Sequence, residues 1–205
     1  MTTYAEFKEY VTLSLWKMGD SVVIGALDLL IKQAEASLNR DLMVERRAKM
    51  GDVVATTSDF PMPTDCYTVR HIHIPNAGVS VYVSPSDFNT MKDYWVEGVG
   101  RYYTTVGNTI RLLGTIDASN PYTLNLTYYT KIPSYKDDDT SWVAEDFFDL
   151  YLYTVLKQTG PFLREDERLP MWNALAAEAL ASALAANEDM KYAGSPLRIN
   201  FGIIA

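Results

Sequence analysis

The chain has 205 residues, with 18 Lys or Arg against 26 Asp or Glu, so its formal net charge is −8. Apolar residues make up 48% of the chain, which is typical of a globular protein and excludes a disordered one. A single cysteine, Cys66, excludes an internal disulfide and any paired-cysteine metal or redox motif.

The first 50 residues follow a helical period. Thr3 and Glu6 fit a capping box at the start of a first helix, and Gly19 is a natural stop. A second helix is predicted after Asp20 and runs to about Met50. The apolar stripes are Tyr4, Phe7, Val11 and Leu15 in the first helix and Ile24, Leu27, Ile31, Ala34, Leu38 and Leu42 in the second.

Over residues 51–135 the apolar period changes to two, which indicates β-strands. We predict a hairpin with its turn at residues 75–78 and then a short helix over residues 84–91. A second hairpin turns at residues 107–108, where the sequence is Gly-Asn. The last clear strand covers residues 123–128.

The helical period returns at about residue 136, where acidic residues suit the positive end of a helix dipole. Gly160 and Pro161 are expected to end this helix. A final helix is predicted over residues 166–190, with Pro170 tolerated near its first turn. The expected buried face before Gly160 comprises Phe147, Leu150, Tyr151, Thr154 and Val155.

This order of periods predicts an α+β fold. We expect an antiparallel helical bundle of two N-terminal and two C-terminal helices, with an inserted, mostly antiparallel β domain and an extended C-terminal tail. The discontinuous helical domain takes residues 1–50 and 136–192, the inserted β domain residues 51–135, and the tail residues 193–205. We expect no membrane span, because no stretch approaches the roughly 18 apolar residues that cross a bilayer. We also expect no signal peptide, because the first residues lack the basic start and the apolar run of one.

Few residues in the sequence suggest chemistry. His71 and His73 share one face of a strand, as two metal ligands would, but a third ligand is missing. The acidic run at residues 137–139 fails the spacing of a calcium-binding loop and fits a helix cap better. Phosphate-binding and hydrolase motifs are absent from the sequence. We therefore predict no catalytic residue, no metal, no cofactor and no enzymatic activity.

Two other features suggest contacts. Cations gather near the predicted end of the second helix; interleaved acids favour a solvated, paired helix face, with nucleic-acid contact as the alternative. The cations are Arg40, Arg46, Arg47 and Lys49, and the interleaved acids are Glu35, Asp41 and Glu45. Five of the last nine residues are large and apolar, so the tail either packs on its own core or docks on a partner. The partner-binding candidates are Leu197, Arg198, Ile199, Asn200 and Phe201.

Several short segments also occur in an order that can be compared with known protein families. They include Ala34-Glu35 with Leu38 to Leu42, Met62 to Asp65, Tyr102 to Thr104, Leu126 to Tyr129, Asp149 to Tyr153, Pro161 to Leu163 and Gly194 to Leu197. In this order the chain resembles the head-to-tail adaptor family (connector, gatekeeper, tail tubular protein A-like) of short-tailed bacteriophages. Cys66 and Pro170 depart from the family's pattern.

The resemblance implies a structural virion protein that assembles in the host cytoplasm and acts at the head-to-tail junction. Family members form a homo-oligomeric ring, usually of twelve copies, between the portal protein and the tail nozzle protein. The ring forms part of the channel for genomic DNA, which passes without sequence-specific binding, and it involves no membrane. The tail candidates would bind the portal or a neighbouring subunit, and an acidic channel would repel phosphate so that DNA slides.

Two alternatives from other classes remain open at this point. A carbohydrate-binding or host-attachment module would use exposed Tyr102, Tyr103, Tyr128 or Tyr129 to stack on sugars. A metal-dependent hydrolase would carry stoichiometric zinc.

Overall fold

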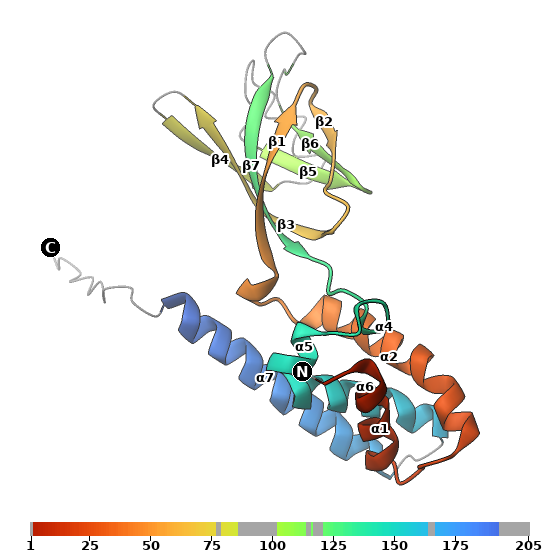
Figure 1. Ribbon diagram of the computed structural model, residues 1–205. Helices are drawn as coiled ribbons and strands as arrows, with labels where there is room; N and C mark the ends of the chain where they lie inside the picture. The colour runs from red at the N-terminus through yellow and green to blue at the C-terminus, as the bar shows by residue number, and fades with distance from the viewer. Residues whose placement is uncertain are drawn as a thin grey trace, which may run out of the picture. The chain divides into compact units, whose positions relative to one another are not determined.

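The computed structural model describes residues 2–76, 79–85, 102–113, 116, 121–163 and 167–192. The chain forms two compact units (Figure 1). The helical unit holds Met1–Glu45 and the chain from Pro133 onward, and the β unit holds Arg46–Ile132. The predicted tail, residues 193–205, lies outside the described residues.

Helix α1 (Tyr4–Ser14) begins at the predicted capping box. The Thr3 hydroxyl accepts a hydrogen bond from the Glu6 N–H at 3.2 Å, and the Glu6 carboxylate accepts one from the Thr3 N–H at 2.8 Å. Two free backbone donors are therefore satisfied, and the capping-box prediction is confirmed. All four residues of the predicted apolar stripe are buried.

Helix α2 (Ser21–Asp41) begins at Asp20, whose carboxylate accepts hydrogen bonds from two backbone N–H groups of the first turn. The predicted run to Met50 is wrong. A single 3-10 turn, η1 (Glu45–Arg47), follows, and the chain then enters strand β1 (Ala48–Ala55). Pairing with a strand from much later in the sequence overrides the helical pattern here. The stripe is buried as predicted except at Ile24, which is half exposed.

The later helical segment contains more breaks than predicted. Its helices are α4 (Tyr135–Asp138), α5 (Trp142–Asp146), α6 (Phe148–Leu163) and α7 (Leu169–Tyr192). Asp139 ends α4 in a left-handed conformation, and Ser141 caps α5. Pro161 does not end α6, because a proline in the last turn removes only one intrahelical bond. Pro170 lies in the first turn of α7, as predicted.

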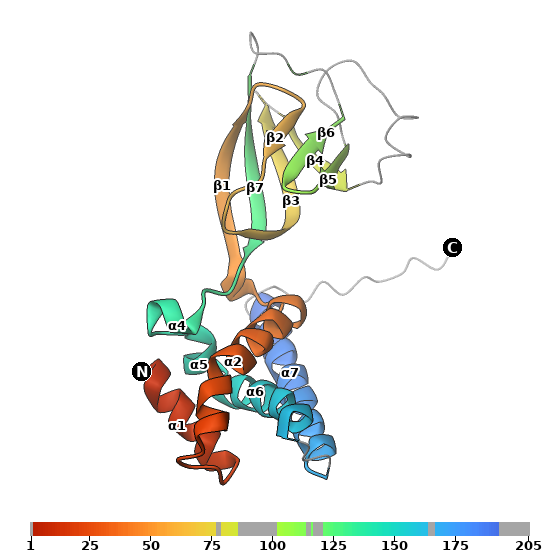
Figure 2. The same cartoon turned by 90° about the vertical axis from the view of Figure 1, so that its right-hand side faces the viewer.

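Helices α6 and α7 lie side by side (Figure 2). The buried face of α6 contains Leu150, Tyr151, Thr154 and Val155, as predicted, while Phe147 is only half buried. On α7, residues at helical spacing turn inward: Trp172, Ala176, Ala179, Ala183 and Asn187. Three alanines in this row allow the helices to approach closely. The Asn187 side chain accepts a hydrogen bond from the Glu45 N–H at 2.7 Å, which satisfies a backbone donor beyond the end of α2.

A buried carboxylate connects α2 to the later helices. Glu35 Oε1 accepts hydrogen bonds from the Tyr135 N–H at 2.8 Å and from the Tyr151 hydroxyl at 3.0 Å. The Tyr151 ring stacks on Phe7 with centroids 4.7 Å apart. Burial and the neighbouring Glu35 charge raise the pKa of Tyr151 well above its ordinary value. Glu35 is therefore a core residue and not one of the acids of a solvated helix face.

Among its described residues, the β unit forms one seven-stranded sheet in the order β1-β7-β3-β4-β5-β6-β2. The remaining strands are β2 (Asp59–Pro61), β3 (Cys66–Asn76), β4 (Val79–Pro85), β5 (Tyr102–Val106), β6 (Thr109–Leu112) and β7 (Tyr122–Thr130). All pairs are antiparallel except β4 with β5, which confirms a mostly antiparallel sheet. Both predicted hairpins are present, and Gly107 turns the second one with φ 58°.

One prediction in this region is wrong. Ser84 and Pro85, expected to start a short helix, belong to β4, while residues 86–91 lie outside the described residues. The core of the sheet follows the predicted alternation, with Ile72 and Ile74 buried on the core side of β3.

The sequence prediction for Arg47, which places this side chain on a solvated helix face, is also wrong. Its side chain is 1% exposed, and Nε and Nη2 donate hydrogen bonds to the Thr130 carbonyl at 2.9 and 2.7 Å. The guanidinium lies 5.2 Å from the centre of the Tyr67 ring, and burial lowers its pKa. Arg47 thus fastens the start of β1 to the end of β7. Nearby Lys49 is in β1 and pairs with Asp65 at 2.7 Å, so these cations do not form a helix face.

Candidate functional site

The chain leaves α1 through a turn that normally contains glycine. The Trp16 N–H donates to the Leu13 carbonyl at 3.0 Å, and the Lys17 N–H donates to the Thr12 carbonyl at 3.1 Å. These two bonds form a Schellman motif, in which the residue after the helix cap is left-handed. Trp16 occupies that position with φ 56°. For an L-residue other than glycine this conformation costs about 1–2 kcal/mol.

Burial of the Trp16 side chain offsets little of this cost, because the side chain is 85% exposed. Large apolar residues on either side are exposed as well. We name this set the α1–α2 apolar surface: Tyr10, Leu13, Trp16, Met18 and Val22. Leu15, between them, is buried and anchors the turn to the core. Clusters of exposed apolar side chains mark sites of interaction with other proteins.

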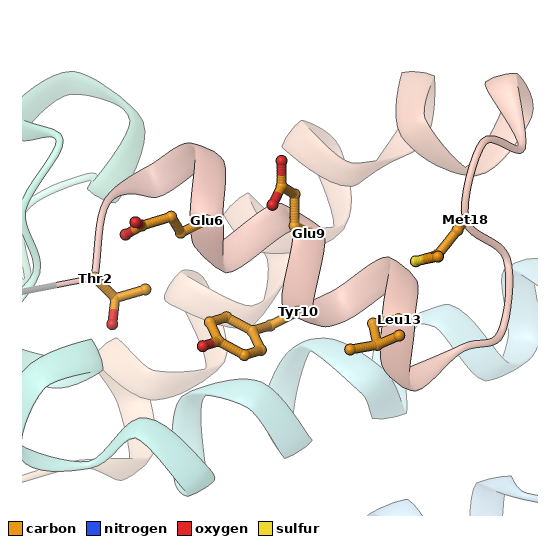
Figure 3. Close-up of a pocket in the computed structure, with 6 residues that line it drawn as sticks. All are labelled: Thr2, Glu6, Glu9, Tyr10, Leu13 and Met18. Atoms are coloured by element: carbon orange, nitrogen blue, oxygen red, sulfur yellow. The ribbon is translucent and has the colours of Figure 1, made fainter.

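A hollow of about 530 Å³ runs along α1 beside this surface. Figure 3 shows Tyr10 and Leu13 on α1, with Met18 pointing back toward the helix from the loop. Glu6 and Glu9 supply the acidic part of the lining. The Thr3 N–H bond to Glu6 lowers the pKa of that carboxyl, which is already used by the helix cap. The hollow therefore presents both apolar and acidic groups at the surface of the helical unit.

Further apolar side chains are exposed where α6 ends and α7 begins. Phe162 and Met171 are about half exposed. In both views the end of α6 and the start of α7 lie at the same end of the helical unit as the loop between α1 and α2 (Figures 1 and 2). The exposed apolar character of this end is thus built from two parts of the sequence that are far apart.

The tyrosines expected to stack on sugars are not all available. Tyr103 and Tyr128 are each 3% exposed, and the Tyr128 hydroxyl donates to Asp65 at 3.0 Å. The expectation that they are exposed is wrong, because both side chains belong to the core of the β unit. Tyr102 and Tyr129 are half buried. The structure therefore weakens the carbohydrate-binding alternative.

His71 and His73 lie on the half-buried face of β3, opposite the core. The His73 ring nitrogen Nδ1 is 3.1 Å from the Asn125 side-chain oxygen, and the Asn125 amide donates to Asp52. Within the described part of the chain, no three His, Cys, Asp or Glu residues are placed to hold a metal. Nor is any helix there long and apolar enough to cross a membrane.

The predicted partner-binding residues Leu197, Arg198, Ile199, Asn200 and Phe201 lie outside the described residues. The α1–α2 apolar surface is absent from the sequence prediction, which treated Gly19 as the end of the helix. One signal could have identified it. Leu13, Trp16 and Met18 are large apolar residues that fall off the buried stripe of α1.

The comparisons with known proteins point to one family. A sequence model of the family described as SU10 adaptor protein matches residues 2–200, which is nearly the whole chain. The match spans both the helical unit and the β unit. No curated protein matches the chain significantly.

Proposed function

The chain belongs to the SU10 adaptor protein family, a phage head-to-tail adaptor family, and on that premise we propose that it forms a ring between the portal and the tail nozzle. The family implies a structural role in an oligomeric assembly with portal and tail proteins. The proposal comprises three points: the ring, its twelve copies and its part in lining the DNA channel. The net charge of −8 supports a channel wall that repels phosphate.

The structural observation that supports an assembly surface on the helical unit is the exposed Trp16 in a left-handed turn. A residue that breaks a local folding rule without burial in its own chain points to selection for something other than folding. Aromatic residues are enriched at the centres of protein interfaces. The α1–α2 apolar surface is therefore proposed to become buried when the adaptor assembles.

Trp16→Gly separates folding from assembly. We expect the variant to be more stable than the natural chain by about 1 kcal/mol, because glycine adopts the left-handed conformation at little cost. We also expect fewer rings on portal particles, because the exposed indole is lost. Urea unfolding measures the first effect and sedimentation with portal rings the second. If Trp16→Gly forms as many rings as the natural chain, Trp16 has no role in assembly.

A matched pair of methionines controls for general loss of apolar surface. Met18, on the α1–α2 apolar surface, and Met190, near the end of α7, are both 71% exposed. Met18→Ser should weaken ring formation, while Met190→Ser should leave it close to the natural level. Equal effects of the two changes would show that position on the surface does not matter.

The ring itself is tested by sedimenting the full chain with portal rings of the same virus and imaging the pellet by negative stain. A saturable added ring at one end of the portal is the expected result, and its image gives the copy number. A chain lacking residues 196–205 should remain folded and add no ring. Absence of binding by the full chain to folded portal rings would overturn the adaptor role.

A further inference from the structure

Strand β1 forms one edge of the seven-stranded sheet. It pairs with β7 along all eight of its residues, and it has no second partner among the described strands. An open edge presents a row of backbone donors and acceptors to which another strand can add. At the other edge, β2 has only three residues, so β1 is the longer template.

The two faces of β1 differ in character. Ala55 is buried in the core of the sheet, Val53 packs against that core, and Gly51 shares their side of the strand. Lys49, at the start of the same side, is exposed and pairs with Asp65 at 2.7 Å. Space beside Gly51 is open, since a methyl group placed there would meet no atom within 4 Å. On the opposite face Met50 and Val54 are exposed, and the exposed carboxylate of Asp52 lies between them.

The end of the chain has the pattern of a strand that suits this edge. Leu197, Ile199 and Phe201 alternate with Arg198 and Asn200, so an extended segment would be apolar on one side and polar on the other. Five residues in a strand extend about 17 Å, which is shorter than β1. The segment carries one positive charge on its polar side, and β1 carries one negative charge on its outward face.

We propose that residues 197–201 of one copy add as a strand to the β1 edge of a second copy. This inference rests on the proposed ring. With Arg198 beside Asp52, either strand direction places Leu197, Ile199 and Phe201 on the side of Gly51 and Val53. There they extend the apolar core into the open space, while backbone hydrogen bonds supply affinity. A contact between unlike surfaces of neighbouring copies is the kind that closes into a ring.

The test uses full-length chains that carry one new cysteine each. Chains with Asp52→Cys are mixed with chains with Arg198→Cys, assembled on portal rings and also concentrated without portal, and then oxidised. We expect disulfide-linked pairs of chains roughly tenfold more abundant than in a control mixture, because the contact raises the local thiol concentration. The control replaces Asp52→Cys by Asp59→Cys, which places the cysteine on the opposite edge strand. The natural Cys66 is buried and sets the background.

The possible outcomes distinguish the tail contact from the adaptor role. Added rings on the portal without linked pairs would overturn the tail contact and leave the adaptor role intact. Linkage only within single chains, in the double variant Asp52→Cys with Arg198→Cys, would show that the tail packs on its own copy. Absence of linked pairs, together with absence of rings from the natural chain on the same portal particles, would remove the adaptor role and the tail contact together.

Charge reversal gives a second readout that does not depend on thiols. Asp52→Arg and Arg198→Asp should each reduce the amount of ring on the portal, and the two changes combined should restore it. Failure of the combination to restore any ring would contradict the pairing of these residues.

Discussion

Replacing Glu35 by alanine should lower the free energy of unfolding of the helical unit by about 3 kcal/mol or more. The carboxylate is buried, and a single oxygen accepts both the Tyr135 N–H and the Tyr151 hydroxyl. Alanine leaves these two donors without their acceptor inside the core, and a buried donor without a partner is costly. It also leaves a cavity beside stacked aromatic rings.

Two variants distinguish this explanation from a general loss of charge. Glu35→Gln keeps an acceptor oxygen in the same place and should cost clearly less than alanine. Glu9→Ala, on the exposed side of α1, should change stability by about 0.5 kcal/mol or less. Hydrogen exchange of the α6 backbone under native conditions measures the effect within the helical unit. Equal exchange in Glu35→Ala and Glu9→Ala would contradict the role assigned to the buried carboxylate.

Replacing Arg47 by alanine should destabilise the β unit by about 3–5 kcal/mol. The change removes both hydrogen bonds to the Thr130 carbonyl and the contact with the Tyr67 ring. It also empties the volume of a large, fully buried side chain. Since Arg47 precedes β1 and Thr130 ends β7, the expected consequence is fraying of this pair of strands. Faster hydrogen exchange in β1 and β7 is the measurement that checks it.

The neighbouring arginine provides the matched control. Arg46 is exposed, and Arg46→Ala should change stability by about 0.5 kcal/mol or less. Arg47→Met retains most of the buried volume without a buried charge, so it should cost less than alanine. If Arg46→Ala and Arg47→Ala destabilise the β unit equally, burial of the guanidinium is not what fastens the strands.

These effects also bear on assembly. In the proposed contact, a tail strand adds to the β1 edge, so fraying of β1 in Arg47→Ala should weaken rings as well as the fold. By contrast, Trp16→Gly is expected to weaken rings while the fold gains stability. The two variants therefore separate loss of the adaptor through unfolding from loss through a missing contact.

Features that depend on close neighbours along the chain can be predicted from the amino-acid sequence alone. The capping box at Thr3 and Glu6, the Asp20 cap and the Gly107 turn each need only a few adjacent residues. The same holds for the α+β class, because the apolar period changes within the sequence at about the right places. Family membership was likewise visible in the order of short segments, and the family match confirms it.

Features that depend on residues far away in the sequence become visible only in the folded chain. The helical pattern after Asp41 is overridden because residues 48–55 pair with strand β7, whose residues lie 67 to 81 positions later in the sequence. Arg47 and Glu35 look like surface charges in the sequence. In the fold, Arg47 donates to the Thr130 carbonyl, and Glu35 accepts from the Tyr135 N–H and the Tyr151 hydroxyl. Tyr103 and Tyr128 are buried in the core of the β unit, and the Tyr128 hydroxyl donates to Asp65. Buried charged and hydroxyl groups need hydrogen-bond partners, and the partners of Arg47, Glu35 and Tyr128 lie far away in the sequence, so a local pattern cannot reveal their burial.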